Sequence, residues 1–373
     1  MKIMVTGGLG FIGQALAKRL ETAGHDVILI DSLTPQIHGT LPTLKAPDGV
    51  AVTRLDVRDI ARHVDLVDGC DAVYHLAAET GTAQSMYRVQ EYVAVNELGT
   101  AALIEAIAAS KTRPKRVILA SSRSVYGEGA YTTPARPDIL VQPDPRTPDQ
   151  LARNNWEPQT AAGETLRAVA TPEDLPFSPG SIYAATKASQ ELLLRAAGPA
   201  LGFKPVIFRF QNVYGEGQSL QNPYTGIISI FFNRARQGMT IPIYEDGLES
   251  RDFIHIQDIV DGLLAALEAD LPNGATMNLG AGEATTVLGL VEELLKAGSF
   301  DVPVKVTGQY RVGDIRHCFA DITRASSLIG FKPKITLSEG LARFCMWAGA
   351  QPVHEDRLEQ ASAELRARKL MGD

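Results

Sequence analysis

Tyr183 and Lys187 bring a phenol and an ammonium group together at the start of a helical pattern. Residues four apart share one face of a helix, so the two groups are expected to be neighbours. A tyrosine has a pKa of about 10 and is a poor base at neutral pH, but a nearby cation favours the phenolate and lowers that pKa. The pair therefore predicts a tyrosine that takes a proton from a hydroxyl group. Taken alone, a Tyr-x-x-x-Lys pair is more often an ordinary contact on a surface helix.

A serine-rich turn supplies a third polar group. Ser121–Gly127 follows the fifth expected strand, and ligands bind at the carboxyl ends of strands in open α/β sheets. Ser122 is expected to hydrogen-bond the reacting oxygen and to orient Tyr183. In a chain without Tyr183 and Lys187, Ser122 would be interpreted as a turn serine.

A glycine-rich turn joins the first expected strand to a helix. It fits both Gly8-x-Gly10-x-x-Gly13 and Gly7-x-x-Gly10-x-x-Gly13. A Cβ atom at these positions would block a tight turn and keep the backbone away from a pyrophosphate. The following helix offers that anion free N–H groups and a positive dipole end. A glycine pattern alone is a weak signal, but its place between a strand and a helix predicts a dinucleotide site.

Two carboxylates end the next two expected strands. Asp31 follows Gly13 by 18 residues and can accept hydrogen bonds from both ribose hydroxyls of an adenosine. It would repel a 2′-phosphate, so it favours NAD over NADP as the cofactor. The alternative is a strand-end aspartate that caps a turn. Asp56 is equally well explained as a binding residue or as a helix cap.

The elements that must position these groups alternate between strands and helices. The expected strands are short and rich in Val, Ile and Leu, as doubly buried strands are: Lys2–Thr6, Asp26–Asp31, Val50–Leu55, Asp71–Leu76, Arg116–Ser121 and Pro205–Phe210. The expected helices are Phe11–Thr22, Ala83–Ser110, Ile182–Ala200, Gly226–Gln237, Ile256–Ala269 and Thr286–Ala297. This alternation predicts an α/β protein with a Rossmann-type, doubly wound parallel sheet and a smaller mixed α/β lobe towards the C-terminus.

The alternation of strands and helices predicts how the chain is divided into domains. Residues 1–215 are expected to form the dinucleotide-binding domain, with an irregular surface insert at 128–180 that is rich in Pro, Asp, Arg and Thr. Residues 216–353 are expected to form a substrate-binding lobe interleaved with that domain. Residues 354–373 are charged and are expected to form a solvated helical tail.

Composition excludes several classes of function. Asp and Glu number 43 against 36 Lys and Arg, a net charge of −7, and no basic stripe suggests a nucleic-acid partner. Cys70, Cys318 and Cys345 have no ligand spacing and are expected to be reduced thiols. The chain starts directly on a strand, without a signal sequence, and no apolar run approaches the length of a membrane span. We therefore expect a cytoplasmic enzyme with no membrane partner.

The order of the motifs resembles the extended short-chain dehydrogenases/reductases, in particular the nucleotide-sugar epimerase/dehydratase family. Besides the glycine turn, the matching stretches are Asp56-Val57, His75–Ala78, Asn96, Ser121–Gly127, Tyr183–Lys187, Arg209–Gly215, Arg251–His255 and Arg311–Asp314. They span almost the whole chain in the family's order.

This resemblance implies roles for single residues. Catalysis would belong to Ser122, Tyr183 and Lys187. The cofactor-binding residues would be Gly7, Gly10, Phe11, Ile12, Gly13, Asp31, Ser32, Asp56, Val57, Leu76, Ala77, Ala78, Asn96, Ser121, Tyr183, Lys187, Phe210 and Val213. The substrate-binding residues would be Thr80, Ser122, Arg123, Asn212, Arg251, Arg311 and Asp314. A guanidinium suits a diphosphate well, although either Arg251 or Arg311 taken alone could form a surface ion pair.

One departure narrows the reaction that the resemblance implies. Family dehydratases carry an Asp-Glu pair before Val-Tyr-Gly, whereas this chain has Arg123-Ser124. Without those carboxylates, 4,6-dehydration is disfavoured and NAD-dependent 4-epimerisation of a nucleotide sugar is expected. The alternatives are a net nucleotide-sugar oxidoreductase and, further behind, a non-catalytic NAD-binding regulator.

Two stretches, Glu79–Tyr87 and Gln218–Gly226, are similar to a subgroup that acts on dTDP-L-rhamnose or UDP-glucose. Its members often carry cysteine pairs in the insert, but Thr160–Gly163 stands where one pair is expected. We therefore expect no metal. The resemblance further implies a dTDP- or UDP-sugar substrate and a homodimer built on the two long helices.

Overall fold

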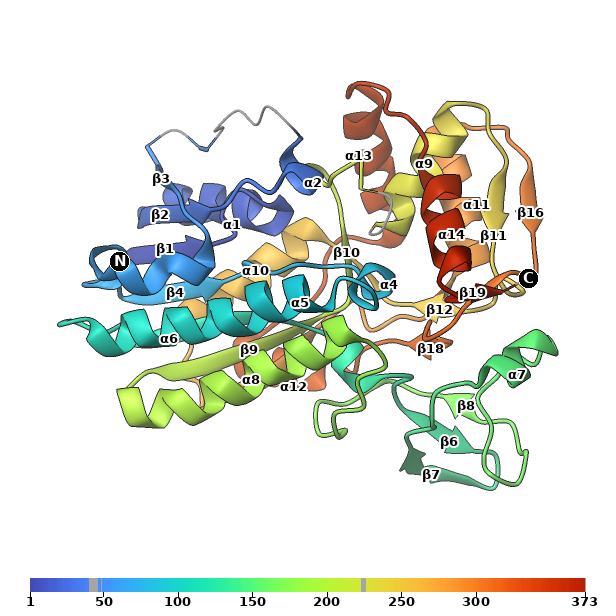
Figure 1. The fold of residues 1–373 in the computed structure, drawn as a ribbon, viewed down its shortest axis with the longest axis horizontal. Coiled ribbons are helices and arrows are strands. Elements are labelled where there is room, and N and C mark those ends of the chain that lie inside the picture. Colours follow the sequence, from blue (N-terminus) through green and yellow to red (C-terminus); the bar gives the residue numbers. More distant parts are fainter. Residues whose placement is uncertain (40–45, 48, 223–225, 373) are drawn as a thin grey trace.

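Seven parallel strands form the main sheet of the computed structural model, in the order β14-β9-β5-β4-β1-β2-β3 (Figure 1). The structure describes residues 1–39, 46–47, 49–222 and 226–372. The strands are β1 (Lys2–Thr6), β2 (Asp26–Asp31), β3 (Ala51–Arg54), β4 (Ala72–His75), β5 (Arg116–Ser122), β9 (Lys204–Phe210) and β14 (Ala275–Leu279). The chain runs outward from β1 to β3 and then returns to the other side of β1 at β4. This reversal creates a crevice at the carboxyl ends of the strands, and the doubly wound sheet expected from the sequence is confirmed.

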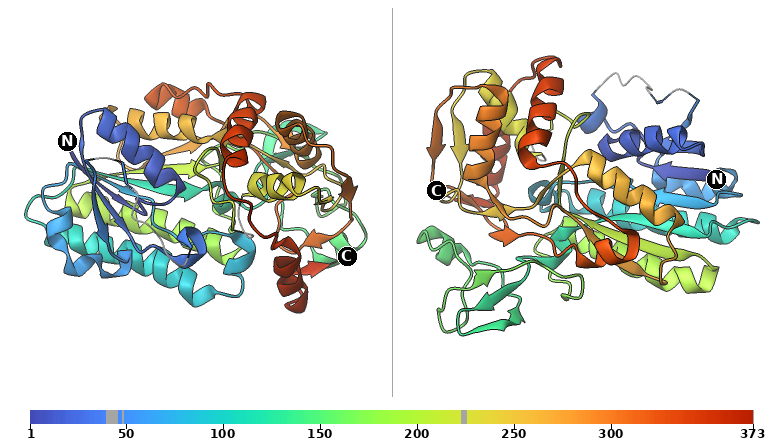
Figure 2. Two further views of the ribbon diagram at one scale, coloured as in Figure 1. Left: turned by 90° about the horizontal axis from the view of Figure 1, so that it is seen from above. Right: turned by 180° about the vertical axis from the view of Figure 1, so that it is seen from behind.

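Helices cover both faces of this sheet (Figure 2). One face carries α1 (Phe11–Thr22), α10 (Ile256–Glu268) and α12 (Thr323–Ile329), and the other carries η1 (Val57–Arg62), α3 (Val64–Val67), α6 (Gly99–Ala109) and α8 (Ile182–Leu201). Successive strand residues point to opposite faces. Ile3 and Val5 accordingly join one hydrophobic cluster and Met4 joins the other. The unbroken apolar runs in the sequence therefore follow from two buried faces.

The expectation of one helix over Ala83–Ser110 was wrong at its start. The chain forms α4 (Thr82–Ser85), α5 (Val89–Tyr92), a π-helical stretch η2 (Val93–Leu98) and then α6. Arg88 leaves the helical region, with φ −111° and ψ 40°. The separate turn α4 brings the Ser85 hydroxyl within 3.0 Å of the Tyr183 N–H, which donates to it. Side-chain contacts with another helix thus override the local helical pattern.

The expectation that no segment is long and apolar enough to cross a membrane was also wrong. Among the described residues, the continuous helix Val89–Ala109 meets that test of length and composition. In this fold it packs against η1 and α8, and it buries Leu103, Ala106 and Ile107 in the cluster beneath the sheet.

Several small sheets surround a second hydrophobic cluster towards the C-terminus. They pair β10 (Asn212–Tyr214) with β13 (Phe253–His255), β11 (Ile241–Ile243) with β16 (Val304–Val306), β12 (Ser250–Arg251) with β15 (Thr285–Thr286) and β18 (His317–Cys318), and β17 (Tyr310–Arg311) with β19 (Met371–Gly372). The helices α9 (Ile227–Arg236), α11 (Val287–Gly298) and α13 (Leu337–Gly349) enclose the cluster. We refer to these elements, without β17 and β19, as the lobe.

The insert is more regular than its composition suggested. It holds β6 (Tyr131–Thr133), β7 (Arg136–Val141), β8 (Arg167–Ala168) and α7 (Pro148–Ala152), and it projects away from the main sheet (Figure 1). Buried arginines bind it to the lobe. Arg146 pairs with Glu128 and with Glu245 of the lobe, and Arg316 pairs with Glu157 of the insert and with Glu245. Ion pairs thus anchor the insert.

The tail differs from the solvated helix expected over 354–373. It forms α14 (Leu358–Ala367) and then β19, and Ala361, Leu365 and Met371 are buried. Ala361 and Leu365 are four apart and share one helix face, which gives this charged segment an apolar side. The remaining short elements are α2 (Pro35–His38) and η3 (Arg123–Tyr126).

Candidate active site

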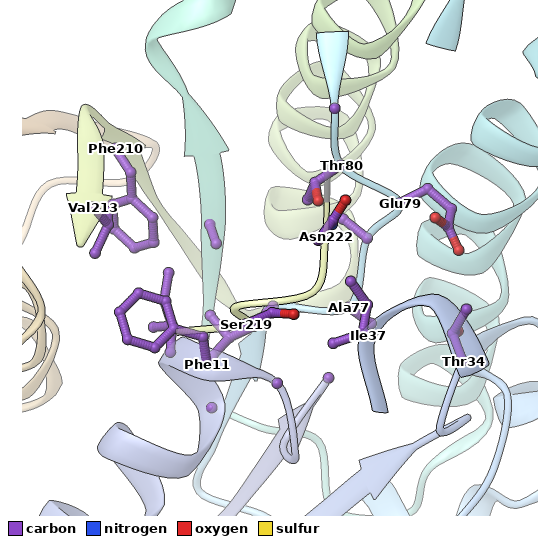
Figure 3. Close-up of a pocket in the computed structure, with 18 of the residues that line it drawn as sticks. Phe11, Thr34, Ile37, Ala77, Glu79, Thr80, Phe210, Val213, Ser219 and Asn222 are labelled. Atoms are coloured by element: carbon purple, nitrogen blue, oxygen red, sulfur yellow. The ribbon is translucent and has the colours of Figure 1, made fainter. Parts of the chain in front are cut away.

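A cavity of about 900 Å³ lies at the carboxyl ends of the central strands (Figure 3). Most residues predicted to bind or react line it. These are Gly7, Gly10, Phe11, Ile12, Gly13, Asp31, Ser32, Asp56, Val57, Leu76, Ala77, Ala78, Thr80, Ser121, Ser122, Arg123, Tyr183, Lys187, Phe210, Asn212 and Val213. Phe210 and Val213 lie on one side of the cavity, and Ile37 of α2 and the preceding Thr34 lie on the other (Figure 3).

The glycine turn makes a cradle that side chains would fill. Gly7 has a φ of +65°, and a Cβ there would lie 2.8 Å from Ala77 N. A Cβ at Gly13 would lie 2.4 Å from the Gly7 carbonyl oxygen. The helix α1 begins after Gly10 without a side-chain cap, which leaves its first N–H groups to a ligand. The cradle therefore fits the pyrophosphate of a dinucleotide.

Asp31 presents a fixed carboxylate to the same cavity. Its oxygens accept hydrogen bonds from the backbone N–H groups of Leu9 (3.0 Å) and Leu33 (2.8 Å), and His38 Nε2 lies 3.5 Å away. Burial raises the pKa of Asp31, but the hydrogen bonds from His38, Leu33 and Leu9 outweigh burial and bring it below its usual value. An ionised carboxylate here suits ribose hydroxyls and opposes a 2′-phosphate.

Asp56 acts as a helix cap. Its Oδ1 accepts from Arg58 N at 2.9 Å at the start of η1, and its carboxylate also pairs with the Arg58 guanidinium. This is one of the two interpretations left open by the sequence, and Asp56 lines the cavity as well.

The first turns of α8 carry Tyr183 and Lys187. Ser181 caps this helix by accepting a hydrogen bond from Ala184 N at 3.1 Å. Lys187 Nζ lies 6.0 Å from the centre of the Tyr183 ring and donates to the Ala120 carbonyl at 2.8 Å. The helix and the end of β5 thus bring the phenol, the ammonium and Ser122 to one wall of the cavity.

The electrostatics of Tyr183 differ from the expectation. Burial raises its pKa above the usual value, while the hydrogen bond with Ser122 and the charge of Arg123 lower it. The cation with this effect is therefore Arg123, whereas Lys187 had been expected. Burial lowers the pKa of Lys187 to about 7, against the opposing effect of Glu191. A buried ammonium near neutrality is a weaker source of positive charge than a guanidinium.

Arg123 occupies the position at which the resemblance to dehydratases leads us to expect a carboxylate. Its Nε donates to Asn212 Oδ1 at 2.8 Å, and both residues line the cavity. Ser124, the next residue, is buried. The site therefore presents a guanidinium at this point.

Four predicted residues lie outside the lining of the large cavity. The buried Asn96 side chain binds both the N–H and the carbonyl of Glu79. Arg251 donates to the carbonyls of Ser250 and Arg316. Arg311 and Asp314 form an ion pair, with Nε 2.7 Å from Oδ2, beside a small second pocket. Ser121 does line the cavity, but its hydroxyl donates to buried Glu191.

Two segments of the lining were missed from the sequence. The helix α2 contributes Ile37 and His38, the residue before it contributes Thr34, and the turn after β10 contributes Ser219 and Asn222 (Figure 3). Ser219 and Asn222 belong to a stretch that marked the subgroup, and this was the available signal. Within that stretch, Pro223 to Thr225 lie outside the described residues.

The described part of the chain offers no evident metal ligands. No group of three or more His, Cys, Asp or Glu side chains is placed there to hold a metal ion. Cys70, Cys318 and Cys345 are buried free thiols.

Comparisons with known proteins match this geometry. Residues 3–151 and 160–280 match the NAD dependent epimerase/dehydratase family. The chain is 36% identical over 350 residues to dTDP-L-rhamnose 4-epimerase from Burkholderia thailandensis, which covers 93% of this chain and 94% of that protein. It is 28% identical over 357 residues to dTDP-glucose 4,6-dehydratase from an Actinoplanes species, which covers 93% of this chain and 97% of that protein. The solved UDP-glucuronic acid 4-epimerase from Bacillus cereus, in complex with UDP-glucuronic acid and NAD, is similar with a TM-score of 0.75 at 27% identity, covering 94% and 99% of the two chains.

Proposed function

Because the chain belongs to the NAD-dependent epimerase/dehydratase family, we propose that it is an isomerase that inverts C4 of a nucleotide-activated sugar. The observation that carries this proposal is the meeting of Tyr183, Ser122 and the glycine cradle around one cavity, with Arg123 in place of a carboxylate. The cofactor is NAD, held by the glycine cradle and by Asp31.

Each polar side chain has a defined part in this reaction. Tyr183 takes the proton of the C4 hydroxyl and returns it to the new hydroxyl, and Ser122 holds the same oxygen. The charge of Arg123 favours the phenolate that this step requires. Bound at the glycine cradle and Asp31, NAD would supply reversible hydride transfer at C4, so the net reaction would need no external oxidant.

Arg123 argues against dehydration as the net reaction. Loss of water from a 4-keto sugar needs an acid and a base beside C5 and C6, and the Arg123-Ser124 pair supplies neither. The elimination step of a dehydration would therefore have no acid–base pair at this position of the chain.

The substrate that we propose is a dTDP- or UDP-sugar. The relative with 36% identity is named for dTDP-L-rhamnose and the solved neighbour holds a UDP-sugar. Arg251 and Arg311 are the guanidinium groups proposed for the diphosphate, with Asp314 near the nucleoside. Thr80 and Asn212 would contact the sugar.

We further infer that two copies pair through the helical layer of Val89–Ala109 and α8. These helices pack side by side on one face of the sheet. Leu98 is 60% exposed and Leu192 is 55% exposed on them. A Leu98→Glu variant is expected to shift the mass in light scattering from a dimer to a monomer. A monomeric wild type would refute this pairing.

The experiment for the activity uses enzyme loaded with NAD. Incubation with dTDP-L-rhamnose, UDP-glucose or UDP-glucuronic acid should yield a C4-inverted sugar by NMR, without net change in absorbance at the wavelength of NADH. Tyr183→Phe should reduce turnover by about 10²- to 10⁴-fold while keeping bound NAD. Stoichiometric NADH formation would favour a net oxidoreductase, and an undiminished Tyr183→Phe variant would refute the assigned base.

A further inference from the structure

The strand that carries Arg311 pairs with the C-terminal segment of the chain. The strand β17 pairs antiparallel with β19, and Val312 N donates to the Leu370 carbonyl at 3.0 Å. Among the described residues, β17 has no other strand partner. The backbone at Arg311 therefore depends on the last residues of the chain for its ladder of hydrogen bonds.

The tail also supports the surroundings of the Arg311 side chain. The guanidinium carbon of Arg311 lies 5.4 Å from the centre of the Tyr244 ring. The Tyr244 hydroxyl in turn lies 3.1 Å from Ser362 Oγ in α14. Both the backbone and the aromatic platform of this arginine are thus fixed by the same terminal segment.

The same segment also contacts the turn between α4 and α5, on the side of the molecule proposed to bind the cofactor. The Tyr87 hydroxyl donates to Glu364 Oε2 at 3.1 Å, and the Arg368 guanidinium lies 4.2 Å from the Tyr87 ring. Tyr87 lies in the turn between α4 and α5. Both Figure 1 and Figure 2 place α14 beside this turn and against the lobe.

A small pocket lies where the loop after β17 meets α4 and the start of α8. It is bordered by Thr82 of α4, Ser181 at the start of α8, Leu370 of the tail and the loop Arg311–Asp314. Ser181 is two residues before Tyr183. The loop that carries the proposed diphosphate ligand is therefore seated between the tail and the helix that carries the proposed base.

The tail adds little to the core of the lobe. No hydrophobic cluster formed by the described residues includes a residue after Ala348. The tail is attached at its start by an ion pair between Arg234 and Asp356 and by a hydrogen bond from Asn233 to the His354 carbonyl. Its polar contacts are therefore made with α9, with Tyr244 and with the turn between α4 and α5.

We propose that the segment His354–Gly372 is a brace that positions Arg311 for the diphosphate and Asp314 for the nucleoside of a nucleotide sugar, and that joins the lobe to the turn between α4 and α5 through Tyr87. This inference rests on the proposed function for the identity of the ligand. Arg368, Glu364 and Ser362 act through Arg311 and Tyr87, so they are positioning residues.

The first test replaces Tyr87 in enzyme loaded with NAD. Tyr87→Leu removes both the hydrogen bond to Glu364 and the ring beneath Arg368. It should raise KM for the nucleotide sugar about tenfold, which is the effect of losing one such pair of contacts. The value of kcat and the NAD content should be unchanged. Tyr87→Phe keeps the ring and should give an intermediate KM.

The matched control lies in the same tail. Arg357→Gln removes an exposed ion pair with Glu355 that is far from β17 in the chain. It should leave KM unchanged. An unchanged KM in Tyr87→Leu, or a fall in kcat without a rise in KM, would overturn the brace.

A second readout separates this inference from the proposed activity. Calorimetric binding of dTDP or UDP needs no turnover, and a chain that ends at Val353 should bind both nucleotides at least about tenfold more weakly than wild type. If wild type binds the two nucleotides but inverts no sugar, the proposed function fails. The effect of the tail on nucleotide affinity can still be measured in that case. Equal affinity in the shortened chain overturns the brace. Should that chain not fold, the Tyr87→Leu affinity decides in the same way.

Discussion

Arg123 Nε donates a 2.8 Å hydrogen bond to Asn212 Oδ1 at the wall of the cavity that holds Tyr183. The two residues come from η3 and β10, which are far apart in the chain. Their contact fixes a positive charge near a phenol whose pKa is raised by burial and lowered by Ser122 and by this charge. Arg123, which stands where the dehydratase pattern has a carboxylate, therefore lowers the pKa of the proposed base Tyr183.

Replacing Arg123 by Gln should therefore move the pH profile. As the proposed base, Tyr183 would act only when ionised, so kcat/KM should rise as the pH rises through its pKa. Loss of the guanidinium raises that pKa, and the rising limb should shift to higher pH. Arg123→Lys keeps a charge and should shift the limb less. A limb that stays in place in Arg123→Gln would show that this charge does not act on Tyr183.

Replacing Asp31 by Asn should weaken the selection against a 2′-phosphate. The amide carries no charge to repel the phosphate and accepts fewer hydrogen bonds from ribose hydroxyls. We expect the Kd for NAD to rise about tenfold and the preference for NAD over NADP to shrink, as measured by fluorescence titration. Asp26→Asn, at the exposed start of the same strand, is the control. An unaltered preference would place the selectivity elsewhere.

Glu249 should make wild-type stability fall as the pH rises. Burial raises the pKa of Glu249 to about 7, against Arg251 and Arg316. A carboxyl with a raised pKa in the folded state stabilises the fold fully below its unfolded pKa of 4.5 and loses that contribution as the pH rises through about 7. Glu249→Gln does not ionise. Its Tm should therefore exceed that of wild type by a few degrees at pH 8.5, and the difference should close towards pH 5. A constant difference would show that the carboxyl does not titrate in this range.

The Arg209–Glu191 pair should be costly to break. Both side chains are almost fully buried, and Glu191 Oε2 accepts from Arg209 Nη2 at 2.8 Å. Glu191→Gln leaves the guanidinium without its counter-charge and should cost about 3–5 kcal/mol, seen as a lower Tm. Glu339→Gln breaks an exposed pair with Arg343 and should cost less than about 1 kcal/mol. Equal losses in the two variants would contradict the role of burial.

The sequence predicted the parts of this fold that depend on local pattern. The glycine turn and the strands around it obey short-range rules of backbone geometry and burial, and Lys2–Thr6, Phe11–Thr22 and Asp26–Asp31 have the expected bounds. The break before Val89 could not be predicted, because it depends on the contact of Ser85 with Tyr183, 98 positions away. The contribution of α2 to the cavity was missed for a similar reason, since four residues carry little periodicity.

The electrostatic surroundings of single site residues depend on contacts between distant parts of the chain, which the sequence pattern does not reveal. The spacing of Tyr183 and Lys187 was sufficient to place both on one helix face. It could not reveal that Lys187 Nζ is directed to the Ala120 carbonyl, nor that Arg123 approaches from another element. The tail was misjudged because its charged residues obscure the apolar positions Ala361 and Leu365, whose burial depends on partners elsewhere in the chain.

The strand β14 has a consequence for how the molecule can be divided. It lies in the main sheet beside β9, with Ala275–Leu279 paired to Val206–Phe210. Between these two strands, the chain passes through several elements of the lobe. A fragment that stops at Gly215 would expose the whole hydrogen-bonding edge of β9 and its apolar side chains, which invites aggregation. Neither half of the molecule is thus a transferable module, and chimaeras that exchange sugar specificity with a relative must graft loops instead of domains.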